Sequence, residues 1–151
     1  MAAMMIDTNV LVYAYDRAEP EKQRRALTVL DELARSGDGV LSAQVLSEFF
    51  VTVTRKIGAP LTVQEAHERL RHYVQMWPVV PVTSQVVLEA VRGVHEYHLS
   101  FWDAQIWAAA RLSQVSVVLS EDFDSGAVIE GVRFVDPFAD DSELRESGVG
   151  E

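Results

Sequence analysis

The chain has 151 residues, of which 48% are hydrophobic, and a net charge of −10 at neutral pH. This size fits one globular domain that can bury a core without crosslinks. The absence of cysteine excludes disulfides, thiolate metal sites and a cysteine nucleophile. The net negative charge argues against nucleic-acid binding through a general basic surface. Bound divalent cations would, however, reverse the sign of the local electrostatic field.

Targeting signals are not evident in the sequence. No apolar run approaches the ~20 residues that span a bilayer, and residues 1–5 lack the charge and apolar core of a signal peptide. We therefore expect a cytoplasmic protein with no membrane association.

The first predicted elements flank an acidic residue. Residues 4–6 form a short apolar run typical of a buried strand, and the apolar segment 10–15 predicts a helix. Asp7 lies where the strand gives way to the helix, and Asp is a preferred helix N-cap. In an open α/β sheet, ligands also bind at this edge, beyond the carboxyl ends of the strands. Asp7 is thus a candidate for a cap, for a functional site, or for both.

Helices and strands alternate along the rest of the chain. Apolar patterning predicts helices at residues 21–36, 43–57, 63–76, 84–97 and 101–113, and strands at 40–41, 77–82, 115–119 and 132–135. This alternation predicts an α/β fold, a three-layer α/β/α sandwich with a short, mostly parallel sheet. The domain is expected to span residues 1–138, followed by an acidic C-terminal tail at 139–151.

Three further acids stand out by their positions. Glu48 lies at the rim of the apolar face of its predicted helix, and Asp103 is the only charge in the apolar segment 101–110. Asp122 follows the strand predicted at 115–119. Each also has a simple structural explanation: a solvated helix position for Glu48, the first helical turn for Asp103, and a turn for Asp122.

Taken together, the motifs around these acids resemble those of a known family. They occur in the order Asp7-Thr8-Asn9, Ser47-Glu48-Phe49, Phe101-Trp102-Asp103-Ala104 and Leu119-Ser120-Glu121-Asp122-Phe123. In this order and spacing the chain resembles the PIN-domain nucleases, and among them the small VapC-type toxins of prokaryotic toxin–antitoxin pairs. The resemblance extends from residue 4 to residue 138 and implies a PIN-like fold.

The resemblance implies a Mg²⁺- or Mn²⁺-dependent endoribonuclease that cleaves single-stranded RNA. The residues that match the family's catalytic, metal-binding acids are Asp7, Glu48, Asp103 and Asp122, and those that match or neighbour its supporting positions are Asn9, Ser120 and Asp124. Sequence alone leaves open whether Glu121, Asp122 or Asp124 faces the metal. The resemblance also implies a homodimer bound by a VapB-like antitoxin.

Residue chemistry is consistent with this hypothesis, because hard divalent cations prefer carboxylate and water oxygens. The spacing of His95 and His98 would suit zinc, but no third ligand is evident. The RNA contacts are less defined, and the candidates are Arg17, Arg24, Arg25, Arg55 and Lys56.

Three alternatives remain open at this stage. A phosphatase or phosphoacceptor domain also places acids at strand ends, but a haloacid-type phosphatase would have an Asp where this chain has Asn9. A non-catalytic RNA-binding or scaffold protein could share the PIN-like fold. Finally, the four acids could be separate helix caps and turn residues in an unrelated domain.

Overall fold

The computed structural model describes residues 3–139, so the expected acidic tail lies outside the described residues except for Ala139. The strands are β1 (Met4–Ile6), β2 (Gly39–Ser42), β3 (Val79–Val80), β4 (Val117–Leu119), β5 (Val128–Ile129) and β6 (Val132–Val135). The helices are α1 (Thr8–Tyr13), α2 (Pro20–Ser36), α3 (Ala43–Arg55), α4 (Val63–Met76), α5 (Ser84–Tyr97) and α6 (Phe101–Leu112).

The described strands form one sheet in the order β3-β2-β1-β4-β6-β5. All neighbouring strands are parallel except β5 and β6, which form an antiparallel hairpin at one edge. The predicted α/β class with a mostly parallel sheet is therefore confirmed. At the other edge, β3 is shorter than the strand predicted at 77–82, because prolines on both sides of β3 cannot donate to a ladder.

The β5–β6 hairpin was absent from the sequence prediction. Its turn residues, Glu130 and Gly131, both have positive φ, at 49° and 83°. Such φ values are typical of the two-residue turns whose twist matches that of hairpin strands. With two residues, β5 is too short to show an alternating pattern, so its strand character depends on pairing with β6.

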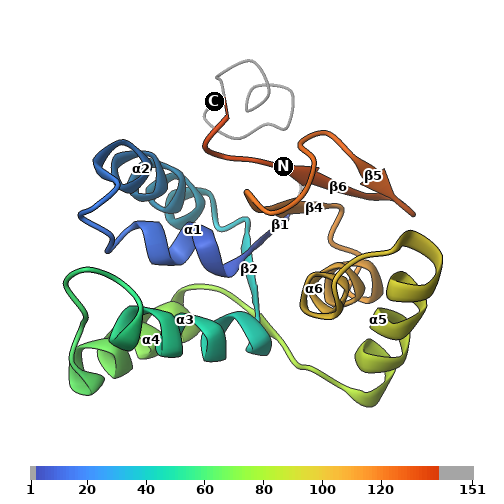
Figure 1. The fold of residues 1–151 in the computed structure, drawn as a ribbon, viewed down its shortest axis with the longest axis horizontal. Coiled ribbons are helices and arrows are strands. Elements are labelled where there is room, and N and C mark those ends of the chain that lie inside the picture. Colours follow the sequence, from blue (N-terminus) through green and yellow to red (C-terminus); the bar gives the residue numbers. More distant parts are fainter. Residues whose placement is uncertain (1–2, 140–151) are drawn as a thin grey trace.

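The direction of the strand connections reverses between β1 and β4. From β1 the chain proceeds to β2 and then β3 on one side of the sheet, whereas β4 and β6 lie on the other side of β1. Right-handed crossovers then place α1 to α4 against one face and α5 with α6 against the opposite face. Figure 1 shows these two groups of helices apart, with α5 and α6 together at the lower right. Open α/β sheets bind ligands at such a reversal.

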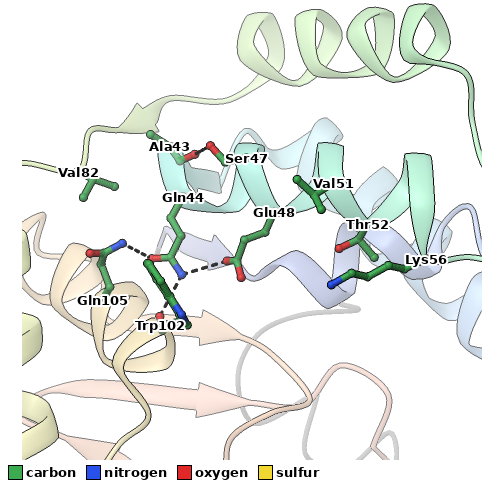
Figure 2. A pocket seen from close by; sticks show the side chains of 10 residues that line it. All are labelled: Ala43, Gln44, Ser47, Glu48, Val51, Thr52, Lys56, Val82, Trp102 and Gln105. Atoms are coloured by element: carbon green, nitrogen blue, oxygen red, sulfur yellow. Dashed lines mark hydrogen bonds between the residues drawn. The ribbon is translucent and has the colours of Figure 1, made fainter.

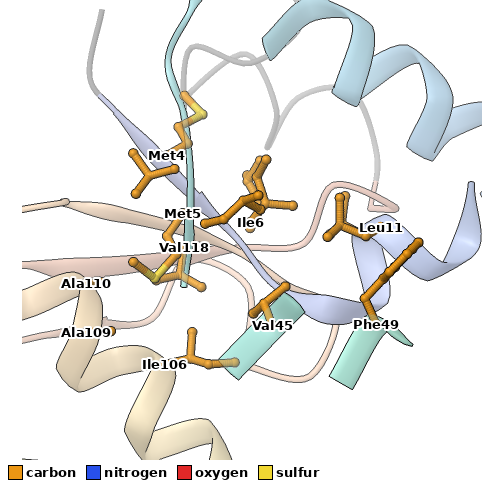
Figure 3. Close-up of a cluster of buried hydrophobic side chains, with 14 of the residues drawn as sticks. Met4, Met5, Ile6, Leu11, Val45, Phe49, Ile106, Ala109, Ala110 and Val118 are labelled. Atoms are coloured by element: carbon orange, nitrogen blue, oxygen red, sulfur yellow. The ribbon is translucent and has the colours of Figure 1, made fainter. Parts of the chain in front are cut away.

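The hydrophobic core joins the elements that carry the four acids. Met5 and Ile6 of β1 are fully buried, as are Val45 of α3 and Val118 of β4. Figure 3 shows these side chains converging with Ile106 of α6. Because packed interiors resist small displacements, the core fixes the relative positions of β1, α3, β4 and α6.

Side-chain caps determine where α3 and α6 begin. The hydroxyl of Ser42 accepts a hydrogen bond from Val45 N at 3.2 Å, and that of Ser100 accepts one from Asp103 N at 3.4 Å. Each bond satisfies an amide that lacks a partner within its helix. The caps thereby set the register of Glu48 and Asp103 relative to the sheet.

No helix within residues 3–139 combines the length and apolar character needed to cross a membrane.

Close packing between Gly39 of β2 and the indole of Trp77 provides a test of the fold. A β-carbon at Gly39 would lie 2.5 Å from Nε1 of Trp77, whose indole is buried and donates to Leu33 O at 3.4 Å. We expect Gly39→Ala to lower the free energy of unfolding by about 1–3 kcal/mol, as overpacking of a core does. Urea denaturation measures the change. Gly58→Ala is the matched control, because a β-carbon there meets no atom within 4 Å; equal stability of the two variants would contradict the prediction.

Candidate active site

The site begins where β1 and β4 end side by side. Their parallel register pairs Ile6 with Leu119, so the next residues of the two strands, Asp7 and Ser120, are neighbours. Ser120 Oγ donates a hydrogen bond to Asp7 Oδ2 at 2.6 Å, and Thr8 N donates to Asp7 Oδ1 at 2.7 Å. Asp7 is therefore both the N-cap of α1 and a member of the polar cluster at this edge.

Asn9 joins this strand pair to Asp122. Its Nδ2 lies 3.1 Å from Asp122 Oδ2, 3.2 Å from Ser120 Oγ and 3.5 Å from Asp7 Oδ2. Asn9 Oδ1 accepts from Glu121 N at 3.3 Å, and Ser120 Oγ accepts from Asp122 N at 3.0 Å. Asn9 and Ser120 thus hold the loop after β4 in a fixed position beside Asp7.

The acids of this loop have different surroundings. Glu121 accepts hydrogen bonds from Tyr13 Oη at 2.6 Å and from Lys22 Nζ at 2.9 Å, so its carboxylate is paired with α1 and α2. Asp124 is exposed, and its backbone oxygen accepts from Ala127 N at 3.0 Å within the loop. Of these acids, the structure connects Asp122 to Asp7.

Glu48 is held from α1 and from its own helix. Its Oε1 accepts from Thr8 Oγ1 at 3.2 Å and from Gln44 Nε2 at 3.0 Å. Figure 2 shows that Gln44 also bonds to α6, where its Nε2 donates to Trp102 O at 3.1 Å and its Oε1 accepts from Gln105 Nε2 at 2.7 Å. The network therefore connects α1, α3 and α6 around Glu48.

Three members of this network were missing from the sequence prediction: Thr8, Gln44 and Gln105. Gln44 and Gln105 are 7% and 5% exposed, and buried amides require partners. Each carried a signal, because Gln44 precedes Glu48 by one helical turn and Gln105 interrupts an apolar segment. Thr8 lies within the Asp-Thr-Asn motif itself.

Asp103 faces the same cluster from the first turn of α6. Burial raises its pKa, and repulsion from Asp122 and Glu48 raises it further, while the hydrogen bond with Ser100 opposes the shift. Asp103 therefore belongs to the first turn of α6 and also to the electrostatic environment of the other acids.

The pKa of Asp7 lies far from its ordinary value. Burial raises its pKa to about 7, against hydrogen bonds from Ser120 and Thr8 that lower it, and the charges of Asp122 and Glu48 add to the rise. Asp7 is 3% exposed, so water screens its charge poorly. A cation at this edge would offset both the desolvation and the repulsion.

The donor chemistry of the cluster fits a hard divalent cation, because carboxylates supply its charged groups. Within residues 3–139, however, no three Asp, Glu or His side chains converge closely enough to share one ion. Binding of one ion by three of these side chains would therefore require them to come closer together. The His95 and His98 pair likewise gains no third ligand within this range.

Two hollows flank the cluster. One, of about 560 Å³, is bordered by Glu48, Trp102 and Lys56, and the other, of about 310 Å³, by Asn9, Asp122 and again Lys56. Glu48 and Asp122 thus each border one open space, and the two spaces share Thr52 and Lys56 at the end of α3.

Solved structures of low sequence identity share this fold. A toxin–antitoxin complex from Klebsiella pneumoniae aligns with TM-score 0.65 and 21% identity over 89% of this chain and 98% of the other. A VapC toxin of Mycobacterium tuberculosis, described as cleaving the sarcin–ricin loop, aligns with TM-score 0.60 and 19% identity over 87% and 99%. A DNA-bound VapBC complex from Salmonella typhimurium aligns with TM-score 0.59 and 17% identity over 91% and 99%.

No curated protein sequence matches the chain significantly. The PIN domain family model matches residues 4–129, which include all four acids. This match covers most of the sequence, and the chain therefore belongs to the PIN domain family.

Proposed function

We propose that this protein is a Mg²⁺- or Mn²⁺-dependent endoribonuclease that cleaves single-stranded RNA, and that it acts as a VapC-type toxin. The observation that carries the proposal is the grouping of Asp7, Glu48, Asp103 and Asp122 around one edge of a PIN-family sheet. The similarity in fold to toxin–antitoxin proteins supports the toxin role.

In this proposal Asp7, Asp103 and Asp122 would hold the cation, and Glu48 would bind it directly or through water. The bound cation would lower the pKa of a water molecule and stabilise the leaving oxygen. Asn9 and Ser120 keep Asp7 and Asp122 oriented.

Glu48, which accepts hydrogen bonds from Thr8 and Gln44, would accept a proton from the attacking water. Attack by water leaves 5′-phosphate and 3′-hydroxyl ends.

The first test is cleavage by the protein free of antitoxin. Wild type should cleave single-stranded RNA with Mg²⁺ or Mn²⁺ and stop when EDTA is added, because the acids need a cation to stabilise charge on the phosphate. Asp122→Asn should lower kcat/KM beyond the roughly 10- to 100-fold loss typical of outer-shell changes at metal sites. The products should be degraded by an exonuclease that requires 5′-phosphate ends.

Asp124→Asn is the matched control, since it removes the same charge from the same loop, where Asp124 is exposed like Asp122 but does not bond to Asn9 or Ser120 as Asp122 does. Cleavage that persists in EDTA, or products with cyclic-phosphate ends, would refute the mechanism. RNA binding without any cleavage would support the non-catalytic alternative.

A second test uses the pH dependence of folding stability. Because the pKa of Asp7 rises from 3.8 to about 7 on folding, the folded state retains this proton over a range where the unfolded state has released it. The free energy of unfolding should fall as pH rises from about 4 to about 7, by at most about 4 kcal/mol for this group. Asp7→Asn should abolish this loss and be more stable than wild type at pH 8 in EDTA.

Urea denaturation at pH 5 and pH 8, each with EDTA and with Mn²⁺, measures these effects. Mn²⁺ should stabilise wild type at pH 8 but not Asp7→Asn, because a ligand that binds only the folded state raises its stability. Asn is also a good N-cap, so the substitution preserves the start of α1. If Asp7→Asn were less stable than wild type at pH 8, Asp7 would be a favourable cap rather than a member of a repelling cluster.

We also infer a VapB-like antitoxin partner, supported by the toxin–antitoxin assemblies of the structurally similar proteins, and a homodimer, which the family resemblance implies. Light scattering coupled to size-exclusion chromatography at micromolar concentration should give about twice the chain mass of 16.8 kDa. Elution at the monomer mass would contradict the dimer.

A further inference from the structure

The larger hollow beside the acids is lined in part by exposed apolar side chains. It lies between α3 and α6, has a volume of about 560 Å³, and takes in Glu48 of the acidic network (Figure 2). Three large apolar side chains line it and remain in contact with solvent: Trp102, Val51 and Val82, which are 61%, 41% and 38% exposed. An occupant with an apolar face would therefore remove apolar surface from water directly beside the proposed catalytic acids.

Trp102 differs from the other tryptophans of the chain. Trp77 and Trp107 are 3% and 0% exposed, and their indole N–H groups donate to Leu33 O and Ile129 O. The Trp102 ring instead remains open to solvent, although its backbone is fixed by the bond from Gln44. Because Trp102 immediately precedes Asp103 on α6, its backbone lies beside that of one of the four acids.

Lys56 supplies the positive charge of this region. It follows α3, lines both hollows, and is the only cationic residue among those lining either of them. Within residues 3–139 it forms no ion pair, whereas Lys22 is paired with Glu121. An anionic group passing between the hollows would therefore meet an available ammonium group.

We propose that this hollow is a nucleobase subsite, in which the Trp102 indole stacks on the base of a nucleotide next to the scissile phosphate and Lys56 contacts a backbone phosphate. The inference rests on the proposed ribonuclease function and adds the residues that hold the substrate. Stacking on an aromatic ring accepts any base, because every base has a π-face. It requires an unpaired base, so the subsite favours single-stranded RNA over a duplex.

The indole N–H signal of Trp102 in ¹⁵N-labelled protein reports on the subsite without cleavage. The sequence contains three tryptophans, and the signal lost in Trp102→Phe identifies the one of interest. In EDTA, a triadenylate RNA should shift the Trp102 signal and leave those of Trp77 and Trp107 unchanged. An abasic trimer of the same charge should shift it much less, because it has no base to stack.

Substitutions then measure the contribution of each contact. Trp102→Ala should raise the KM for RNA cleavage about tenfold, the order expected for loss of one aromatic stacking partner, and change kcat less. Trp102→Tyr should restore most of the loss. The control is Val128→Ala, which truncates a side chain that is also 61% exposed but lies on β5, away from the hollow.

Lys56→Gln should weaken RNA binding. It should also make the decrease of log affinity with log salt less steep, by about 0.7, which is the change for one phosphate contact on a single strand.

The results separate this inference from the proposed function. A base-dependent shift of the Trp102 signal in a protein that does not cleave RNA would support the subsite and refute the nuclease. Cleavage with no shift, or with an unchanged KM in Trp102→Ala, would refute the subsite and leave the nuclease intact. A Trp102→Ala variant that cleaves normally but escapes its antitoxin would also overturn the proposal, because the hollow would then bind the partner protein.

Discussion

The parallel pairing of β1 with β4 is the constraint on which the candidate site depends. Its register aligns the last residues of the two strands, and Asp7 and Ser120 follow as immediate neighbours. The pairing also lies where the strand connections reverse, so helices from opposite faces of the sheet begin near the same edge. Glu48 and Asp103 therefore approach the strand ends from α3 and α6, although 55 positions separate them in the chain. A shift in this register would therefore separate the acids, even though no acidic side chain itself was changed.

Because like charges repel, several acids at one edge of the sheet destabilise the folded state. Particular hydrogen bonds and packing contacts nevertheless hold these acids in place. Neutral donors, rather than cations, surround the most buried carboxylate: Ser120 and Thr8 donate to Asp7, and Asn9 bridges to Asp122. These bonds orient the oxygens but do not cancel their charge, and burial holds the pKa of Asp7 near 7. A cation bound at this edge would offset the charge, while the packed core keeps the repelling groups from separating.

The negative charge of the chain restricts how it could hold RNA. Several arginines of the described region are engaged elsewhere: Arg92 and Arg111 pair with Glu89 and Glu130, and the pKa of Glu130 is lowered to about 2, chiefly by its bond to Arg92. Of the basic residues considered from the sequence, Lys56 is the one that lines both hollows beside the acids. With few cations at the site, an uncharged stacking surface such as the proposed Trp102 subsite would provide attraction that does not depend on charge.

The sequence by itself determined most of the elements and singled out the four acids as candidates, because apolar periodicity, caps and short motifs are local properties that survive without tertiary contacts. It predicted the alternating α/β order and the family resemblance, and the fold and the family are both confirmed. Only the tertiary structure distinguished the surroundings of neighbouring acids, since Glu121 accepts hydrogen bonds from Tyr13 and Lys22 whereas Asp122 accepts one from Asn9. Hydrogen-bond partners in a loop depend on where distant segments lie in space, and no local pattern encodes that position. The same reason explains why β5 and the exposed ring of Trp102 became evident only in the folded chain.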